Sequence, residues 1–413
     1  MQPRSRRTRA LRLIAVVGAP VLAAAAACSS SGTSSASGSS VPQGLTGTEA
    51  GAGANQISAA DAAAATSLSP ATGSFLAGKS TVTVLGSTTP ANGDENPYAI
   101  WPVTENVGSV KTGDVLVDNF NNSSNNQGTG TTIVDLHANG TQSVFAQLPQ
   151  NQSGCTGGVG LTTAMVQLKT GWVIVGSLPS SDGKTATAQP GCLIVLSPTG
   201  SVAETVSEPY LAGPWDAAVQ DDGNTASLFV TNTLVGFGSS TSGKVDQGDV
   251  VRLDLSQTTA SAPKVTAESV IAQGFAEAPD AAAFVKGPTG LALGADGTLY
   301  VADNLGNRIT AIPDAATRTT AEGTGSVLTS GGQLAGPLGL VIAPDGDVLA
   351  ANATNGKIVE VTPAGKQVGE FYADDSIGQD PPGNGDLFDV AIAQDGKGVL
   401  FVNDGTNILQ ELH

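Results

Sequence analysis

Aspartate and asparagine recur where short apolar runs of this chain end. The positions are Asp118, Asn232, Asp303, Asn352 and Asp404. Carboxylate and amide oxygens are the ligands that a hard cation such as Ca²⁺ prefers. If these runs are strands whose ends meet around one opening, the sequence predicts a site for Ca²⁺ or another divalent cation, with Asp118, Asp303 and Asp404 as its carboxylates. The alternative for most of these residues is a structural role, in which a side chain such as that of Asp303 accepts backbone N–H groups of the turn that follows it.

A second set of candidates stands where such runs begin. Asp216 and Asp389 occupy positions that are glycine in two related stretches of the chain, and Trp101 and Trp215 lie at similar starts. A carboxylate there can hold a polar ligand, and the two indoles either line a pocket or plug a channel. We therefore expect Trp101, Trp215, Asp216 and Asp389 to bind a ligand, and we assign no catalytic residue.

A repeat must position these residues. Residues 287–309 hold a Gly-Pro start, an apolar strand, the turn at Asp296 and a second apolar strand. An Asp-Gly pair between two apolar runs is a strong hairpin signal. The same pair recurs at Asp345, 49 residues after Asp296, and at Asp395, 50 residues after Asp345. A period near 50 residues with several short strands in each unit predicts propeller blades.

Three weaker copies lie upstream, the earliest starting near Asn96, which makes six units. The sequence therefore predicts an all-β, six-bladed β-propeller with four-stranded antiparallel blades. The last unit offers only three strands, and an unpaired edge would invite aggregation. We expect residues 80–85 to pair as the outer strand of the last blade and to join the two ends of the domain.

The copy at residues 287–309 resembles an NHL repeat. It has the Pro-x-Gly start, the x-Asp-Gly-x turn, an aromatic-Val-Ala-Asp strand end and Asn-x-Arg-Ile, matched here by Pro288, Gly290, Asp296, Gly297, Tyr300, Val301, Ala302, Asp303, Asn307, Arg308 and Ile309. The resemblance extends from about residue 96 to the C-terminus. It implies a six-bladed propeller of the NHL, TolB-like and gluconolactonase-like kind, an architecture that serves many functions.

Two enzyme classes with this architecture use metals. Gluconolactonase-like propellers hold a divalent metal partly through Asn and Asp at strand starts, where this chain has Thr289 and Leu338, and neither is a strong ligand. NHL-type amidating lyases use His-bound zinc, whereas this chain has only His137 and His413. We expect His137 to lie on a third strand, away from the channel mouth.

The first 28 residues have the features of a lipoprotein signal peptide. Five Arg precede an apolar segment, residues 13–27, that is too short to span a membrane, and the segment ends in a lipobox-like Ala-Ala-Ala-Cys. We expect lipidation of Cys28 and anchoring to the outer face of the cytoplasmic membrane, with plain secretion as the alternative. Residues 29–77, rich in Ser, Gly and Ala, predict a disordered tether, and residues 78–413 the propeller.

Cys155 and Cys192 remain if lipid occupies Cys28. Both fall in the second predicted blade, and an exported protein permits a disulfide between them. The alternative is two buried free thiols.

Acidic residues dominate the charge balance. The chain has 36 Asp and Glu against 18 Lys and Arg, a formal net charge of −18. Because nucleic-acid binding needs clustered Lys and Arg, this balance argues against a nucleic-acid partner. It also argues against docking on anionic lipid, which leaves the lipid anchor as the membrane contact. We expect a monomer whose partner is an envelope protein or a small polar ligand.

These features predict a lipid-anchored, extracytoplasmic propeller that acts as a binding or scaffold module at the cell envelope. The alternative is a metal-dependent, lactonase-like hydrolase with a divergent Asp/Asn site at the channel mouth. A third possibility is an accessory subunit that presents long loops to a partner. The module predicts a mouth blocked by Trp side chains, whereas the hydrolase predicts convergent carboxylates with raised pKa values.

Overall fold

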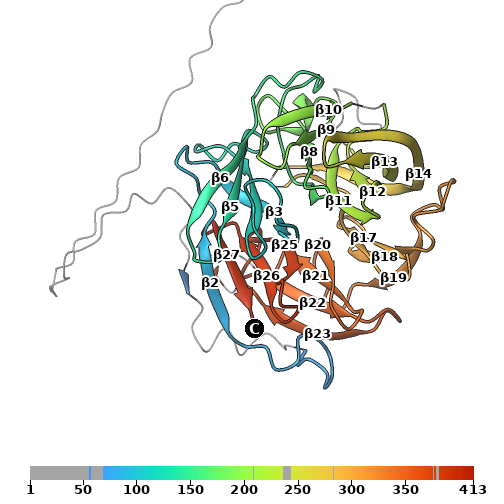
Figure 1. Ribbon diagram of the computed structural model, residues 1–413. Helices are drawn as coiled ribbons and strands as arrows, with labels where there is room; N and C mark the ends of the chain where they lie inside the picture. Colours follow the sequence, from blue (N-terminus) through green and yellow to red (C-terminus); the bar gives the residue numbers. More distant parts are fainter. Residues whose placement is uncertain are drawn as a thin grey trace, which may run out of the picture. The chain divides into compact units, whose positions relative to one another are not determined.

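Short runs of Val, Ile, Leu and Ala, broken by Asp-Gly and Gly-Pro pairs, fold into antiparallel β-strands. The computed structural model describes residues 55–56, 68–207, 209–235, 243–281, 283–374, 376–377 and 381–413 (Figure 1). Among them the helical element is the single 3-10 turn η1 (Thr185–Thr187), and no helix is long and apolar enough to cross a membrane. The predicted signal peptide, Cys28 and most of the predicted tether lie outside the described residues.

The strands form six blades, which confirms the predicted all-β six-bladed propeller. The first blade holds β3 (Glu95–Pro102), β4 (Val115–Asn121), β5 (Thr132–Leu136) and β6 (Gln142–Gln147). The second holds β7 (Met165–Gln167), β8 (Val173–Ser177), β9 (Cys192–Leu196) and β10 (Val202–Val206). The third holds β11 (Pro214–Asp221), β12 (Thr225–Asn232), β13 (Val245–Thr258), β14 (Ser261–Asp280) and β15 (Phe284–Lys286).

The remaining blades follow the repeat more closely. The fourth holds β16 (Pro288–Leu293), β17 (Leu299–Asp303), β18 (Arg308–Ile312) and β19 (Ser326–Ser330). The fifth holds β20 (Pro337–Ile342), β21 (Val348–Asn352), β22 (Lys357–Val361) and β23 (Gln367–Tyr372). The sixth holds β25 (Leu387–Ile392), β26 (Val399–Asn403), β27 (Ile408–Leu412) and, from the N-terminal side, β2 (Val82–Ser87). Two short strands, β1 (Asn55–Gln56) and β24 (Ser376–Ile377), pair separately.

The ring closes through the two ends of the propeller. The innermost strands contact one another in the order β3, β7, β11, β16, β20 and β25, and β25 returns to β3. β2 pairs with β27, with Val82 opposite Leu412. The closing strand is therefore the predicted one, shifted by two residues along the chain.

The third blade departs from the four-stranded pattern. β13 and β14 form a long hairpin, and β15 adds a fifth strand in which Phe284 lies opposite Asp280. Phe284 has φ of +64°, in the left-handed region that a bulky side chain rarely adopts. Such strain persists where surrounding contacts hold it, often near a functional site. The extra strand brings Phe284 to the channel mouth.

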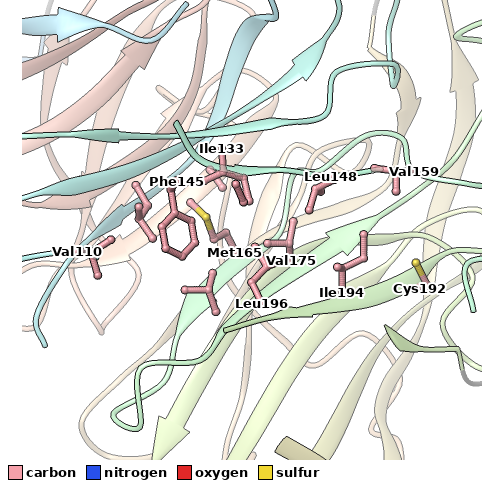
Figure 2. Close-up of a cluster of buried hydrophobic side chains, with 14 of the residues drawn as sticks. Val110, Ile133, Phe145, Leu148, Val159, Met165, Val175, Cys192, Ile194 and Leu196 are labelled. Carbon is pink, nitrogen blue, oxygen red and sulfur yellow. The ribbon is translucent and has the colours of Figure 1, made fainter. Parts of the chain in front are cut away.

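The core consists of apolar layers between neighbouring blades. Between the first two blades, Ile133, Phe145 and Met165 belong to one buried cluster (Figure 2). Cys192 also belongs to it, and its disulfide to Cys155, with Cα atoms 5.5 Å apart, confirms the predicted bridge.

The chain before β2 packs against the fifth blade. The N–H groups of Phe75 and Leu76 donate to the Glu360 carboxylate over 2.6 and 2.9 Å, and the Leu68 N–H donates to Glu370 over 2.9 Å. Leu76 is itself buried. Residues 68–76 thus form an N-terminal strap, and the packed domain begins before the boundary predicted at residue 78.

Candidate functional site at the channel mouth

Five inner strands begin in the same way, and their starts define one mouth of the channel. The register pairs a residue at or near the start of each strand with a polar residue at or near the end of the second strand: Pro97, the third residue of β3, with Asn119, and the first residues Pro214 with Asn232, Pro288 with Asp303, Pro337 with Asn352 and Leu387 with Asn403. Asp118 lies one residue before this position and Asp404 one residue after it. The three predicted metal carboxylates, Asp118, Asp303 and Asp404, are therefore not equivalent and form no ring.

Asp303 and Asn352 hold loops in place. The buried Asp303 carboxylate accepts hydrogen bonds from the Gly306 N–H at 2.9 Å and from Arg308 Nε at 2.7 Å. The Asn352 side chain accepts one from the Ala335 N–H at 3.1 Å. At these two positions the structure supports the alternative that the side chain stabilises a neighbouring loop.

An aromatic floor lies one residue beyond the strand starts. Tyr98, Trp215 and Phe388 stand at this position in the first, third and sixth blades and share one buried cluster. The Tyr98 ring stacks on Phe388 with centroids 5.4 Å apart and meets Trp215 edge-on at 6.0 Å. Trp215 Nε1 donates a hydrogen bond to the Tyr98 hydroxyl at 2.7 Å. Trp215 is therefore buried in this floor and lines the space above it.

The mouth cavity above this floor has a volume of ≈ 260 Å³. Its walls combine apolar side chains, among them Phe120, Leu161, Phe284 and Leu338, with polar or charged ones, which include Asn96, Gln127, Asn304, Thr354, Asn384, Asp280, Lys286, Asp386 and Asp404. Lys286 forms an ion pair with Asp280 at 2.9 Å. The cavity thus combines an aromatic floor with amide and carboxyl groups around it.

Two of these carboxyl groups, those of Asp386 and Asp404, belong to residues whose backbones lie side by side. The Asp404 N–H donates to the Asp386 carbonyl at 2.8 Å. Burial raises the pKa of Asp404 well above its usual range, and the charges of Asp386 and Glu95 raise it further. Asp404 Oδ1 has no hydrogen-bond partner among the described residues. Asp404 is therefore biased toward the protonated form, beside a second carboxyl group.

Asp216 and Asp389 lie below the floor, on opposite blades of the ring. Asp216 Oδ2 accepts the Leu291 N–H at 2.7 Å, and Asp389 Oδ2 accepts the Ile100 N–H at 3.1 Å. Each carboxyl group thus joins its blade to the next, which explains why these positions are not glycine. Both residues are half-buried. The channel reaches one side of each, and protein surrounds the rest. Burial raises the pKa of both, that of Asp389 to about 7, and the Asp389 charge raises that of Asp216 further.

Asp118 and Trp101 also lie away from the mouth cavity. Asp118 is fully buried, and its Oδ1 accepts the Ala99 N–H at 2.8 Å. Burial raises the pKa of Asp118 well above its usual range. Trp101 lines a second cavity of ≈ 560 Å³, together with Asp216 and Asp389, on the other side of the floor. The predicted ligand-binding residues are therefore divided between two cavities, with Trp215 in one and the other three in the second.

The mouth does not fit the metal centre that the resemblance implies. Thr289 is buried, and its hydroxyl lies 3.2 Å from the carbonyls of both Ala302 and Pro337. Leu338 belongs to the apolar cluster. Neither side chain offers a carboxylate or amide oxygen. In the part of the chain that the structure describes, the groups of three possible metal ligands lie elsewhere, at Asp114, Asp135 and His137 and at Asp345, Asp347 and Glu360.

Sequence reasoning missed Tyr98, Phe388 and Asp386. Tyr98 and Phe388 stand at the variable x position of the Pro-x-Gly start, where the repeat itself demands no residue type. Comparing only that position across the six units would have shown three aromatic residues. Asp386 precedes the strand start of the sixth blade, and no feature of the repeat marks it.

Comparison with known proteins supports the fold. No family model matches the chain, and no curated protein matches it. The chain is similar to a gluconolactonase from Xanthomonas campestris, with a TM-score of 0.52 at 15% identity, over 87% of this chain and 93% of that one. It is also similar to the calcium-binding protein regucalcin from Agrobacterium tumefaciens, with a TM-score of 0.48 at 14% identity, over 81% and 93% of the two chains.

A third similar structure is the PQQ-bound aldose sugar dehydrogenase from Streptomyces coelicolor, with a TM-score of 0.48 at 15% identity, over 81% and 98% of the two chains. At these identities the likeness shows the fold alone. The class that fold and comparison define is the six-bladed β-propeller.

Proposed function

We propose that this propeller is a lactonase-like hydrolase that takes a small, polar, ring-shaped ester, such as a sugar lactone, into the mouth cavity. The observation that carries the proposal is the pair Asp386 and Asp404 beside the aromatic floor. A carboxyl group with a raised pKa beside a second carboxyl group in a cavity, like Asp404 here, is typical of a catalytic acid.

The shape and lining of the cavity favour a small ring with one apolar face. At ≈ 260 Å³ the cavity is smaller than the roughly 300–1,000 Å³ of pockets for drug-sized ligands. A ring can pack its apolar face against this aromatic floor, while its hydroxyl groups meet Asn96, Asn304 and Asn384. The ring of a sugar lactone has this division between a face and a polar edge.

The carboxyl pair supplies an acid and a base. Asp386, as carboxylate, accepts a proton from a water whose oxygen attacks the ester carbonyl carbon. Asp404, protonated, donates its proton to the ring oxygen as the C–O bond breaks, which yields a hydroxy acid. A proton then passes from Asp386 to Asp404 through solvent and restores both groups. The raised pKa of Asp404 assigns this residue the role of acid and leaves the role of base to Asp386.

The second candidate function is binding without turnover, as a module of the cell envelope. The hydrogen bond between Trp215 and Tyr98 favours this function, because the bond makes a rigid, closed floor that suits capture of a ligand.

We further propose that the chain is exported, anchored through Cys28, monomeric, and directed to an envelope protein or a small polar ligand. These proposals rest on the signal-like N-terminus and the acidic composition.

A lactone panel distinguishes the two functions. Hydrolysis is followed by proton release in weakly buffered solution, and binding by calorimetry with the corresponding hydroxy acid. Turnover that is lost in Asp404→Asn, while that variant still binds the hydroxy acid, supports the hydrolase. Binding without turnover supports the module. Neither binding nor turnover across the panel overturns both.

A further inference from the structure

His137, just after β5 of the first blade, lies between two buried aspartates. His137 Nδ1 is 3.3 Å from Asp114 Oδ1 and 3.7 Å from Asp135 Oδ2. Only 5% of Asp114 and 2% of Asp135 is exposed, whereas the His137 side chain is 32% exposed. One possible ligand atom from each of the three residues lies within 4.8 Å of the other two.

The strand register builds this cluster. Leu116 pairs with Asp135 and Val115 with Leu136, so continuation of the register places Asp114 opposite His137. Asp135 and His137 are two residues apart and therefore point to the same face of the blade. The turn after β5 fixes His137, because its N–H donates to the Thr141 carbonyl at 2.9 Å. The cluster lies at the end of the first blade opposite the channel mouth, since Pro97 and Asn119 pair at the other end of β4.

The pair of aspartates is not fully satisfied by the protein. Asp135 Oδ1 is buried and has no hydrogen-bond partner among the described residues. An unpartnered oxygen of a buried carboxyl group costs free energy unless a cation or donor offsets it. A single imidazolium could neutralise only one of the two carboxylates. The cluster therefore has an excess of negative charge and an unpartnered carboxylate oxygen, Asp135 Oδ1, and both favour a cation.

The donor types and distances select the kind of cation. Imidazole nitrogen with two carboxylate oxygens suits Zn²⁺ and related divalent transition metals, whereas Ca²⁺ and Mg²⁺ prefer oxygen donors alone. Zinc bonds of about 2.0–2.2 Å in a tetrahedron place ligand atoms roughly 3.3–3.6 Å apart. The observed 3.3 and 3.7 Å separations lie close to that range before any adjustment.

We propose that Asp114, Asp135 and His137 form a Zn²⁺ site, separate from the mouth cavity, that clips the start of β4 to the turn after β5. Three protein ligands leave a fourth position, which water occupies at the exposed side of His137. The Lys111 N–H donates to Asp114 Oδ2 at 2.8 Å and orients that carboxylate, as outer partners of metal ligands do.

The second cluster, Asp345, Asp347 and Glu360, provides a matched comparison. It offers no nitrogen, and Glu360 already accepts two N–H groups of the N-terminal strap. If Zn²⁺ bound to acidic residues without specificity, substitutions in this cluster would weaken binding as much as substitutions in the first.

The test is calorimetric titration of the full, untagged chain with ZnCl₂ after removal of metals by chelation. We expect one Zn²⁺ per chain, at least tenfold weaker binding in His137→Gln and in Asp135→Asn, and no change in Asp345→Asn or Cys28→Ser. Co²⁺ gives an independent signal, because its visible absorption reports four-coordinate binding and should disappear in His137→Gln.

Four results overturn the proposal, and the first three concern Zn²⁺ binding itself. They are absence of Zn²⁺ binding, binding that His137→Gln leaves unchanged, and binding that Cys28→Ser or Asp345→Asn abolishes. If Asp135→Asn does not fold, His137→Gln still decides the matter because its side chain lies at a partly exposed turn. Binding of CaCl₂ in preference to ZnCl₂ also contradicts the assignment.

Discussion

Trp215 Nε1 donates a hydrogen bond to the Tyr98 hydroxyl over 2.7 Å, and this contact joins the third blade to the first across the channel. Both groups are buried, so water cannot replace the bond when one partner is lost. The pair fixes the position of the aromatic floor on which a ligand would lie.

Trp215→Phe should therefore destabilise the protein by about 1–3 kcal/mol, since it leaves the Tyr98 hydroxyl without its partner. It should also weaken ligand binding at the mouth. Urea unfolding and calorimetry measure the two effects. Trp172→Phe is the control, because Trp172 Nε1 makes a similar bond to the Thr258 carbonyl at 2.9 Å, away from the mouth. Equal loss of ligand binding in both variants would contradict a specific role of the floor.

Asp404→Asn should abolish hydrolysis while leaving hydroxy-acid binding within a fewfold of the original. Because burial raises the pKa of Asp404 and the acid must carry a proton, activity of the unchanged protein should fall as pH rises through that raised pKa. A pH–rate profile checks this sign. Asp395→Asn, at an exposed turn, should leave the profile as it was, and activity that survives in Asp404→Asn would remove this residue from the mechanism.

Asp389 should make the protein less stable as pH rises. Burial holds its pKa at about 7 in the folded chain, above the ordinary 3.8, so the folded state binds the proton more tightly. The resulting stabilisation is fully present below about pH 4 and is lost as pH rises through about 7. Urea unfolding between pH 4 and 8 should show this slope, and Asp389→Asn should flatten it. The Asp395 carboxyl has a lowered pKa, so Asp395→Asn should not change this window, and an unchanged slope in Asp389→Asn would refute the assignment.

The N-terminal strap should contribute to stability although the repeat does not include it. A chain that begins at residue 78 loses the buried Leu76 and leaves Glu360 without its two donors, at a cost of roughly 2–5 kcal/mol. A chain that begins at residue 60 keeps the strap and serves as the control. Equal unfolding midpoints for the two chains would show that the strap does not contribute to stability.

Cys28→Ser should move the exported protein from the membrane fraction to the soluble fraction. Intact mass of the membrane-bound form should show an acylated Cys28 as its first residue. Membrane association that persists in Cys28→Ser would contradict the anchor.

The fold was largely predictable, because every blade repeats one hairpin and the repeat period is visible at Asp296, Asp345 and Asp395. The closing strand followed from counting strands, and the Cys155–Cys192 bridge followed from the number of cysteines. The strap was not predictable in the same way. Its contacts depend on Glu360 and Glu370, which lie nearly 300 residues further along the chain.

The site was predicted less well, for a reason of register. Asp118 and Asp404 flank the equivalent position by one residue on either side, and a shift of one residue in a strand changes the face that a side chain meets. Asp216 and Asp389 were recognised as departures from glycine. Their bonds to Leu291 and Ile100 on neighbouring blades depend on the closed ring, which sequence spacing does not contain.

The order in which the strap and the closing strand meet the propeller has a mechanical consequence. The strap docks on the fifth blade, whereas β2 closes the sixth. A pulling force applied to the chain before residue 68 therefore reaches the bonds at Glu360 before it reaches the pairing of β2 with β27. The strap would bear the load first and would protect the pairing of β2 with β27, which closes the ring, from the applied force.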